Sequence, residues 1–158
     1  GLARVKVVVE GLPRYGFIDR HGTMVIEPQY VAAWDFSQWL ARVELRDAAG
    51  LARYGFIDRT GTVAIEPLFE AARDFAEGLA AVSVDGRWGY IDRTGAWVIE
   101  PRFPYAESFV ATGLAAVDLE ELATPVGQET PVYAEYGFHQ ALIDKTGSVV
   151  WVRGQEDE

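Results

Sequence analysis

The stretch GFIDRHGTMVIEP, residues 16–28, decides the fold of this chain because it recurs three more times. The other copies, of which the last is degenerate, are GFIDRTGTVAIEP (55–67), GYIDRTGAWVIEP (89–101) and ALIDKTGSVVWVR (141–153). A second phrase precedes each copy, as GLARV (1–5), WLARV (39–43), GLAAV (78–82) and GLAAV (113–117). Self-similarity of this kind indicates a repeat architecture. We therefore expect one repeat domain over residues 1–158, built from the units 1–38, 39–77, 78–112 and 113–158.

Each unit is predicted to be a three-stranded meander, because apolar residues alternate with a period of two. In the first unit the alternation assigns four residues to the packed face, Ala3, Val5, Val7 and Val9. In the third unit it assigns Ala80, Val82 and Val84 to that face, and the residues between them face the other way. No stretch keeps a 3.6-residue period, so we expect an all-β fold. Each Pro after the third strand is expected to end it, with one short helical turn at most.

The turn between the second and third strands has the pattern Asp-x-x-Gly in every unit. Asp at the first position accepts backbone N–H groups of its own turn, and Gly at the fourth takes a positive φ without penalty. We interpret these residues as structural turn residues rather than chemical groups: Asp19, Gly22, Asp58, Gly61, Asp92, Gly95, Asp144 and Gly147.

A glycine in the middle of each second strand needs a separate explanation, because glycine weakens strands. Gly16, Gly55 and Gly89 each follow an aromatic residue, which is Tyr15, Tyr54 or Trp88. We expect each glycine to seat an aromatic ring of an adjoining strand or unit, so that the rings pack unit on unit. The alternative is a ladder of exposed rings that stacks on sugars or peptides.

The run WGYIDRTG at 88–95, with the VIEP that follows it and the lead-in FAEGLAA (75–81), resembles the bacterial WG repeat, also called KWG. The resemblance covers nearly the whole chain, although Tyr replaces the eponymous Trp in the other units. The last unit departs most, with inserted residues and no Glu-Pro, and we expect it to be cap-like. The resemblance implies a tandem β-hairpin array and no common activity. We expect an open, solenoid-like array, with a closed, propeller-like ring as the alternative.

Composition narrows the possible partners. The 158 residues are 49% hydrophobic and carry a formal net charge of −10, with two histidines and no cysteine. Such acidity disfavours binding to nucleic acid or to an anionic membrane surface. We expect no cofactor and no metal, because cysteine is absent and histidine is scarce. No apolar run approaches the ~20 residues that span a bilayer, and no signal-peptide pattern is present, so the compartment stays open.

The chain begins at Gly1, where the first unit also begins, so we expect an excerpt of a longer array, with further repeats upstream a possibility. No nucleophile, phosphate-binding or dinucleotide motif occurs. The only carboxylates that recur outside the turns come once per unit, whereas a catalytic residue should be singular. They are interpreted as edge charges or partners of the turn arginines: Glu27, Glu66 and Glu100, with Arg20, Arg59 and Arg93. We therefore expect a protein that is not an enzyme.

Any specificity should lie where the units differ. The segment between the first and second strands varies most, and in the last unit it is the acidic loop 120–135. Trp39 stands where other units have glycine, and Trp34 lies near it in sequence; packing within the array is the favoured interpretation of both, and an exposed aromatic anchor the alternative. The candidate partner-binding residues are Trp34, Trp39, Glu120, Glu121 and Tyr133.

These features predict a non-catalytic binding or scaffolding module with a protein partner, and a partner with a basic surface suits the net charge. One alternative is carbohydrate or cell-wall binding through aromatic side chains. A second, less favoured alternative is a hydrolase that uses a pair of carboxylates.

Overall fold

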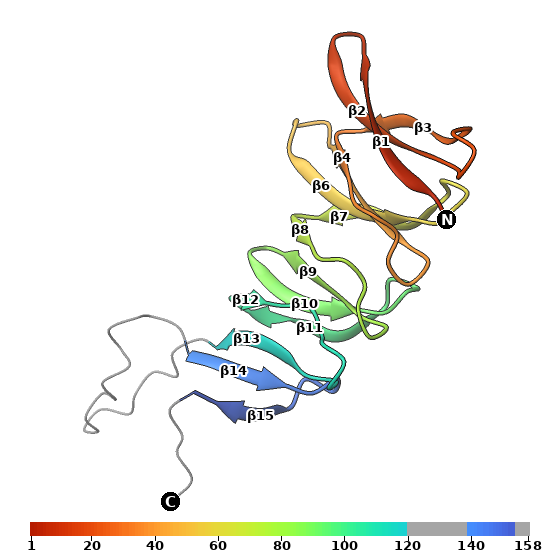
Figure 1. Cartoon of the computed structure of the whole chain (residues 1–158). Coiled ribbons are helices and arrows are strands. Elements are labelled where there is room, and N and C mark those ends of the chain that lie inside the picture. Colours follow the sequence, from red (N-terminus) through yellow and green to blue (C-terminus); the bar gives the residue numbers. More distant parts are fainter. Residues whose placement is uncertain (120–138, 154–158) are drawn as a thin grey trace, which may run out of the picture.

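The computed structural model describes residues 1–119 and 139–153, and over these ranges it contains strands and turns without a helix (Figure 1). The first sheet has three antiparallel strands, β1 (Ala3–Val9), β2 (Leu12–Ile18) and β3 (Met24–Tyr30). The second sheet has four, β4 (Ala32–Ala33), β5 (Ala41–Arg46), β6 (Ala52–Ile57) and β7 (Val63–Phe69). The predicted all-β fold of repeated hairpin units is confirmed.

The third and fourth sheets repeat the order of the second. The third contains β8 (Ala71–Ala72), β9 (Ala80–Val84), β10 (Arg87–Ile91) and β11 (Trp97–Phe103). The fourth contains β12 (Tyr105–Ala106), β13 (Ala115–Leu119), β14 (His139–Ile143) and β15 (Val149–Val152). In each of these sheets the three predicted strands are joined by a two-residue strand that comes from the tract after Glu-Pro.

The prediction that proline ends the third strand is wrong, and in the described residues a short strand rather than a helical turn follows it. Pro28 lies inside β3, which continues to Tyr30 before the chain enters β4. A bulge explains how the strand tolerates this proline: Tyr15 pairs with Tyr30 and Phe17 with Ile26, so one residue of β2 faces three of β3. A bulge leaves residues outside the regular ladder, where the missing N–H of proline does no harm.

The same bulge accounts for the glycine in the second strand, and the predicted aromatic seat is wrong. A Cβ built on Gly89 would lie 2.5 Å from the carbonyl oxygen of Ile99 and 2.7 Å from the backbone nitrogen of Pro101. The glycines of the first two sheets face the same bulged Ile-Glu-Pro backbone. The glycine is required because the neighbouring backbone, and not a ring, occupies the space of its side chain.

The four sheets stack in chain order into an open, elongated array, with the first sheet at one end and the fourth at the other (Figure 1). We call the side of a sheet that meets the following sheet its forward face, and the opposite side its rear face. The forward face of the first sheet, with Phe17 and Ile26, packs on the rear face of the second, with Ala41, Val43 and Ile57. Two further clusters join the second sheet to the third and the third to the fourth.

Burial of the first strands follows from this stacking and corrects the alternation argument. In the third sheet, Ala81 and Ser83 are as buried as Ala80 and Val82, because sheets cover both faces of β9. In the first sheet, the predicted packed face is open instead: Ala3 is exposed and Val7 is 38% exposed. The residues on that rear face are apolar as predicted, but no described part of the chain lies behind them.

Candidate functional site

The Asp-x-x-Gly turns lie along one side of the stack, and each is stabilised by hydrogen bonds within the turn. In the second unit, Oδ1 of Asp58 accepts the backbone N–H groups of Thr60 at 2.8 Å and Thr62 at 3.1 Å. The Thr60 hydroxyl also donates to Oδ1 of Asp58, at 2.6 Å. These hydrogen bonds, the one from the hydroxyl foremost, lower the pKa of Asp58. The turns at Asp19, Asp92 and Asp144 carry the same backbone bonds.

In the second, third and fourth units the glycine of the turn also touches the preceding sheet, whereas nothing lies within 4 Å of a Cβ built on Gly22. A Cβ built on Gly61 would lie 3.2 Å from the side chain of Ile26, and Gly95 lies against Ile65 in the same way. Both glycines have a positive φ, of 86° and 85°. The four aspartate turns are therefore occupied by capping and packing, and their side chains are committed within the turn.

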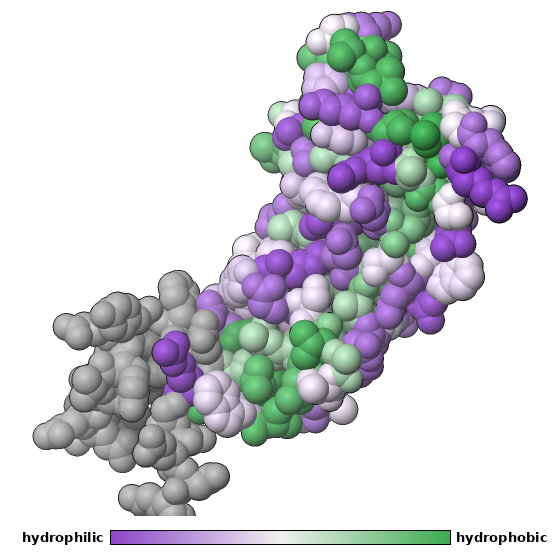
Figure 2. Space-filling model, viewed as in Figure 1, coloured by the Kyte–Doolittle hydropathy of each residue, from purple (hydrophilic) through white to green (hydrophobic). Residues whose placement is uncertain are grey.

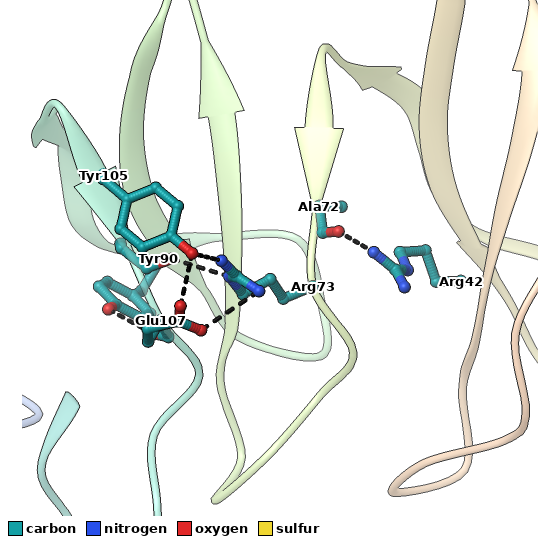
Figure 3. A network of polar contacts seen from close by, with 7 residues as sticks. Arg42, Ala72, Arg73, Tyr90, Tyr105 and Glu107 are labelled. Carbon is teal, nitrogen blue, oxygen red and sulfur yellow. Dashed lines mark hydrogen bonds and ion pairs between the residues drawn. The ribbon is translucent and has the colours of Figure 1, made fainter. Parts of the chain in front are cut away.

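The aromatic residues of the second strands do not form a ladder of free ring faces. Arginine side chains lie beside them along the stack. The guanidinium of Arg4 lies 5.7 Å from the ring centroid of Tyr15 and donates to the Ala33 carbonyl in the next sheet. In the second sheet Arg42 takes the equivalent place, donating to the Ala72 carbonyl of the third sheet (Figure 3). A guanidinium thus ties each of these sheets to its successor through a hydrogen bond to a backbone carbonyl.

Arg42 also contacts an aromatic ring and a carboxylate. Its guanidinium lies 3.8 Å from the ring centroid of Trp34, and its Nε forms an ion pair with Oδ1 of Asp74 at 3.1 Å. Burial lowers the pKa of Arg42, against the opposing effect of Asp74. The ring of Trp34 also packs on Tyr54, at 6.0 Å between centroids. Trp34 is therefore half-buried within the array, as the favoured interpretation expected.

Arg73 joins the third sheet to the fourth from a different position in the repeat. Its Nε donates to the Ala106 carbonyl at 2.8 Å, and its Nη1 forms an ion pair with Oε2 of Glu107 at 3.2 Å (Figure 3). Its Nη2 donates to the Tyr105 hydroxyl, which in turn donates to Glu107. Arg73 occupies the position in the third sheet that Trp34 has in the second, and Ala81 occupies the position of Arg42. The two sheets therefore differ in which segment supplies the arginine.

Tyr90 adds a buried hydrogen bond behind this network. Its hydroxyl donates to the backbone carbonyl of Glu107 at 2.7 Å, and its ring lies 4.8 Å from that of Phe109. Burial raises the pKa of this hydroxyl, because the phenolate would lose its hydration. The hydrogen bond is therefore present throughout the ordinary pH range, and its role is to fix the third sheet on the fourth.

Trp39 differs from every other aromatic residue in the part of the chain that the structure describes. It is 64% exposed and has a φ of +80°, at the second central residue of the tight turn between Ser37 and Leu40. The equivalent residues of later units are Gly78 and Gly113, with φ values of 86° and 78°. A side chain at such a φ costs about 1–2 kcal/mol relative to an ordinary backbone conformation. The chain thus keeps a large exposed ring at a strained position that glycine would fill without strain.

The surroundings hold Trp39 in one orientation. The guanidinium of Arg59 lies over its ring, at 4.5 Å from the centroid. The side-chain oxygen of Gln38 accepts the backbone N–H of Gly78 at 2.8 Å, and the Ser37 hydroxyl donates to the Phe75 carbonyl at 2.6 Å. The turn is thereby fastened to the next inter-sheet turn. Trp39 is therefore exposed, as the alternative interpretation expected, and not packed within the array. Its indole and the Arg59 guanidinium lie side by side at the surface.

Three predicted partner-binding residues remain, Glu120, Glu121 and Tyr133. They lie outside the described residues, and so does the whole loop 120–135. The corresponding segments of the first and third units are hairpins that end in two-residue turns, Glu10-Gly11 and Asp85-Gly86. In the first unit the strands continue to Val9 and Leu12, because the register holds to the tip of the hairpin.

Acidic residues do not form a metal site in residues 1–119 and 139–153. Within these ranges, no group of three histidine or carboxylate side chains could hold a metal ion. Glu27, Glu66 and Glu100 are exposed beside their bulges, and no ion pair joins them to the turn arginines there. Nor does the described structure include a helix long and apolar enough to span a membrane.

Sequence analysis missed the arginine ties between sheets. Arg4 and Arg42 occupy the same place in the phrase LARV, and this repetition was the available signal. Arg73 carried no such signal, because its counterpart in the preceding unit is Trp34. Only the stacking of sheets shows that side chains from two repeat positions reach equivalent carbonyls.

Comparison with known proteins identifies a family whose model matches this chain. The family model described as WG containing repeat matches three consecutive segments, residues 15–47, 54–88 and 88–122. Together these segments cover well over half of the chain. No curated protein and no solved structure matches the chain at a significant level.

Proposed function

Because this chain belongs to the WG repeat family, we propose that it is a non-catalytic repeat module that binds a protein partner through Trp39. The observation that carries the proposal is the exposed indole at a φ of +80°, in a position where the later units have glycine. Backbone strain that persists at a surface side chain points to a function of that side chain. Tryptophan and arginine are the residues most enriched among binding hot spots.

The arrangement of Trp39 suits a protein surface better than a sugar. Arg59 covers one face of the indole, so stacking on a sugar is restricted to the other face. The guanidinium beside the ring adds hydrogen-bond donors for a backbone carbonyl or a carboxylate of the partner. The overall charge of −10 favours encounter with a partner whose surface is basic around that contact.

The absence of catalysis is part of the same proposal. The recurring aspartates are engaged in their own turns, and the recurring glutamates occur once per unit at exposed bulges. Repetition suits a scaffold, because each copy serves the geometry of its own unit.

The substitution Trp39→Gly tests the proposal, since it removes the ring and installs the residue that Gly78 and Gly113 show to fit this turn. The wild-type chain and the variant serve as baits in native extracts, and a captured protein is then purified and titrated. Leu68→Ala is the matched control, because Leu68 is an equally exposed apolar residue on strand β7.

We expect Trp39→Gly to weaken binding of the purified partner by at least about ten-fold, and Leu68→Ala to leave it unchanged. Equal binding by the wild type and the glycine variant would contradict the proposal. Binding of soluble glycans that depends on Trp39 would favour the carbohydrate alternative instead. Hydrolysis of those glycans would contradict the non-catalytic part.

A further inference from the structure

Two arginine side chains in the middle of the array offer hydrogen-bond donors at the surface. They lie on the side of the stack that carries the Asp-x-x-Gly turns, which we call the turn side. Hydrophilic residues gather along this side, at the right of the molecule (Figure 1, Figure 2). Arg59 and Arg93 each follow the aspartate of their turn and are exposed. Within residues 1–119 and 139–153, the Arg59 guanidinium lies over Trp39 but joins no hydrogen bond or ion pair, and Arg93 joins none either.

The carboxylates that accompany these arginines on the turn side have other partners. Oδ1 of Asp58 and Oδ1 of Asp92 accept hydrogen bonds from the backbone and the threonine hydroxyl of their own turns. Glu77, on the turn before β9, forms an ion pair with Lys145 at 3.5 Å. The two arginines therefore offer their N–H donors, five on each guanidinium, to an acceptor from outside.

Repeat equivalence brings Arg93 within reach of the turn that holds Trp39. Nζ of Lys145 extends from the fourth sheet to the turn before β9 and donates to the Glu77 carbonyl at 2.9 Å. Arg93 follows its turn aspartate as Lys145 does, and Gln38 has the position of Glu77 one sheet earlier. An extended Arg93 side chain therefore reaches the neighbourhood of the indole from the third sheet.

We propose that the protein segment bound at Trp39 carries an acidic side chain next to an apolar one, with the apolar side chain on the indole and the carboxylate on the Arg59 guanidinium. Arg93 supplies a second set of donors to the same carboxylate. This inference rests on the binding through Trp39 proposed above and specifies the chemistry of the bound segment. A guanidinium that lies over a ring keeps N–H donors at its edge, and a carboxylate accepts two parallel hydrogen bonds from that edge. The ring also holds the guanidinium in place before binding, so less side-chain entropy is lost.

The acidity of the whole chain is compatible with a carboxylate at this contact. Exposed charges that are separated by more than about 8 Å are largely screened at physiological ionic strength. The bound carboxylate therefore interacts mainly with the local guanidinium groups, whereas the net charge of −10 acts on the approach of the partner as a whole. A partner with a basic surface and a carboxylate at the contact satisfies both conditions.

Selection of peptides from a random library displayed on phage, with the 158-residue chain as the immobilised target, tests the proposal. Phage that also bind Trp39→Gly are removed, so that the recovered peptides depend on the indole. We expect these peptides to contain Glu or Asp beside an apolar residue more often than the unselected library does. Peptides enriched in Lys and Arg, or in neither charge, would overturn the inference while binding through Trp39 stands. A selection that yields no Trp39-dependent peptide would contradict the proposed function, and the inference with it.

A thermodynamic cycle then assigns the carboxylate to Arg59. A selected peptide, and the same peptide with its acidic residue changed to the amide, are titrated into the wild type and into Arg59→Gln. We expect the amide peptide to bind the wild type at least about ten-fold more weakly, and the two peptides to bind Arg59→Gln with nearly equal affinity. A purely structural effect of Arg59 on the Trp39 ring would weaken both peptides alike. A difference between the peptides that persists undiminished in Arg59→Gln would overturn the proposal.

Arg20→Gln is the matched control, because Arg20 has the same repeat position on the first sheet and contacts His21 rather than a tryptophan. We expect it to change the affinity of the acidic peptide by less than about two-fold, whereas Arg93→Gln should weaken binding by about three-fold. Circular dichroism verifies that each variant folds. A loss in Arg20→Gln as large as that in Arg59→Gln would show that the peptide responds to overall charge, and would overturn the proposal.

Discussion

The backbone of Ile65 passes so close over Gly55 that a Cβ on this glycine would lie 2.6 Å from the Ile65 carbonyl oxygen. The backbone nitrogen of Pro67 would be 2.7 Å away, so the bulge leaves no space on either side. Neither group is a flexible side chain, and relief would require the strands to separate.

We therefore expect Gly55→Ala to lower the free energy of unfolding by at least about 3 kcal/mol, through overpacking against backbone. Urea denaturation followed by tryptophan fluorescence measures the change. Gly1→Ala is the control, since nothing lies within 4 Å of that position. A decrease in the free energy of unfolding as small as that of the control would show that the bulge rearranges at little cost.

Arg42 should be the most costly arginine to remove from the row between sheets. Arg42→Ala deletes the hydrogen bond to the Ala72 carbonyl, the stacking on Trp34 and the ion pair with Asp74, and we expect it to lower the free energy of unfolding by about 2–3 kcal/mol. A double-mutant cycle with Asp74→Ala isolates the ion pair. Its coupling energy should be a minor part of the total, because Asp74 is 43% exposed. A coupling energy equal to the whole loss would assign the stabilisation to the pair instead.

Two substitutions at Trp39 should separate backbone strain from side-chain contacts. Both Trp39→Ala and Trp39→Gly remove the stacking with Arg59, but only glycine relieves the φ of +80°. We expect the glycine variant to be more stable than the alanine variant by about 1 kcal/mol, as measured by urea denaturation. The converse substitution Gly78→Ala should be destabilising by a similar amount, because space is free there and only the φ is unfavourable. Equal stability of the two Trp39 variants would mean that the turn relaxes.

Acid should weaken the array through the turn aspartates. Hydrogen bonds from the threonine hydroxyl and the backbone lower the pKa of Asp58, Asp92 and Asp144 in the folded chain. A lowered folded-state pKa means that the stabilisation is complete above the unfolded-state pKa, near about 4, and is lost as the pH falls through the folded-state value. We expect the urea midpoint of the wild type to fall steadily below about pH 4.

Replacing these three aspartates by asparagine should flatten that acid-side loss, because the turns then carry no group that must be protonated. Glu100→Gln changes the charge at an exposed site outside the turns and should follow the wild-type profile, apart from the single charge. Parallel profiles for the wild type and the triple variant would locate the acid sensitivity elsewhere.

Local sequence was sufficient for the hairpin of each unit. The period-two alternation, the Asp-x-x-Gly turn and the fourfold repetition depend on neighbours a few residues apart, so a single chain segment contains the whole cause. Family membership follows from the same phrase. Proline was misjudged because a strand can pass through it at a bulge, and the bulge depends on a glycine of the partner strand, such as Gly16 opposite Pro28.

The candidate site was predictable only in part. Trp39 could be named from the sequence because it replaces a glycine of the other units, whereas its exposure could not. Trp34 lies only five residues earlier in the sequence but is half-buried against Arg42 and Tyr54. Nothing in a linear pattern distinguishes the two, since burial depends on which sheet covers the residue.

The sequence by itself therefore determined the repeating unit, its strands and its turns, because these arise from local sterics and hydrogen bonds. Tertiary structure alone decided which apolar face is covered. Val5 and Val43 occupy the same register position, yet Val43 is buried by a preceding sheet and Val5 remains partly open. It also decided that Arg73 does in one junction what Arg42 does in another, because a guanidinium can reach equivalent carbonyls from two different strands once the sheets are stacked.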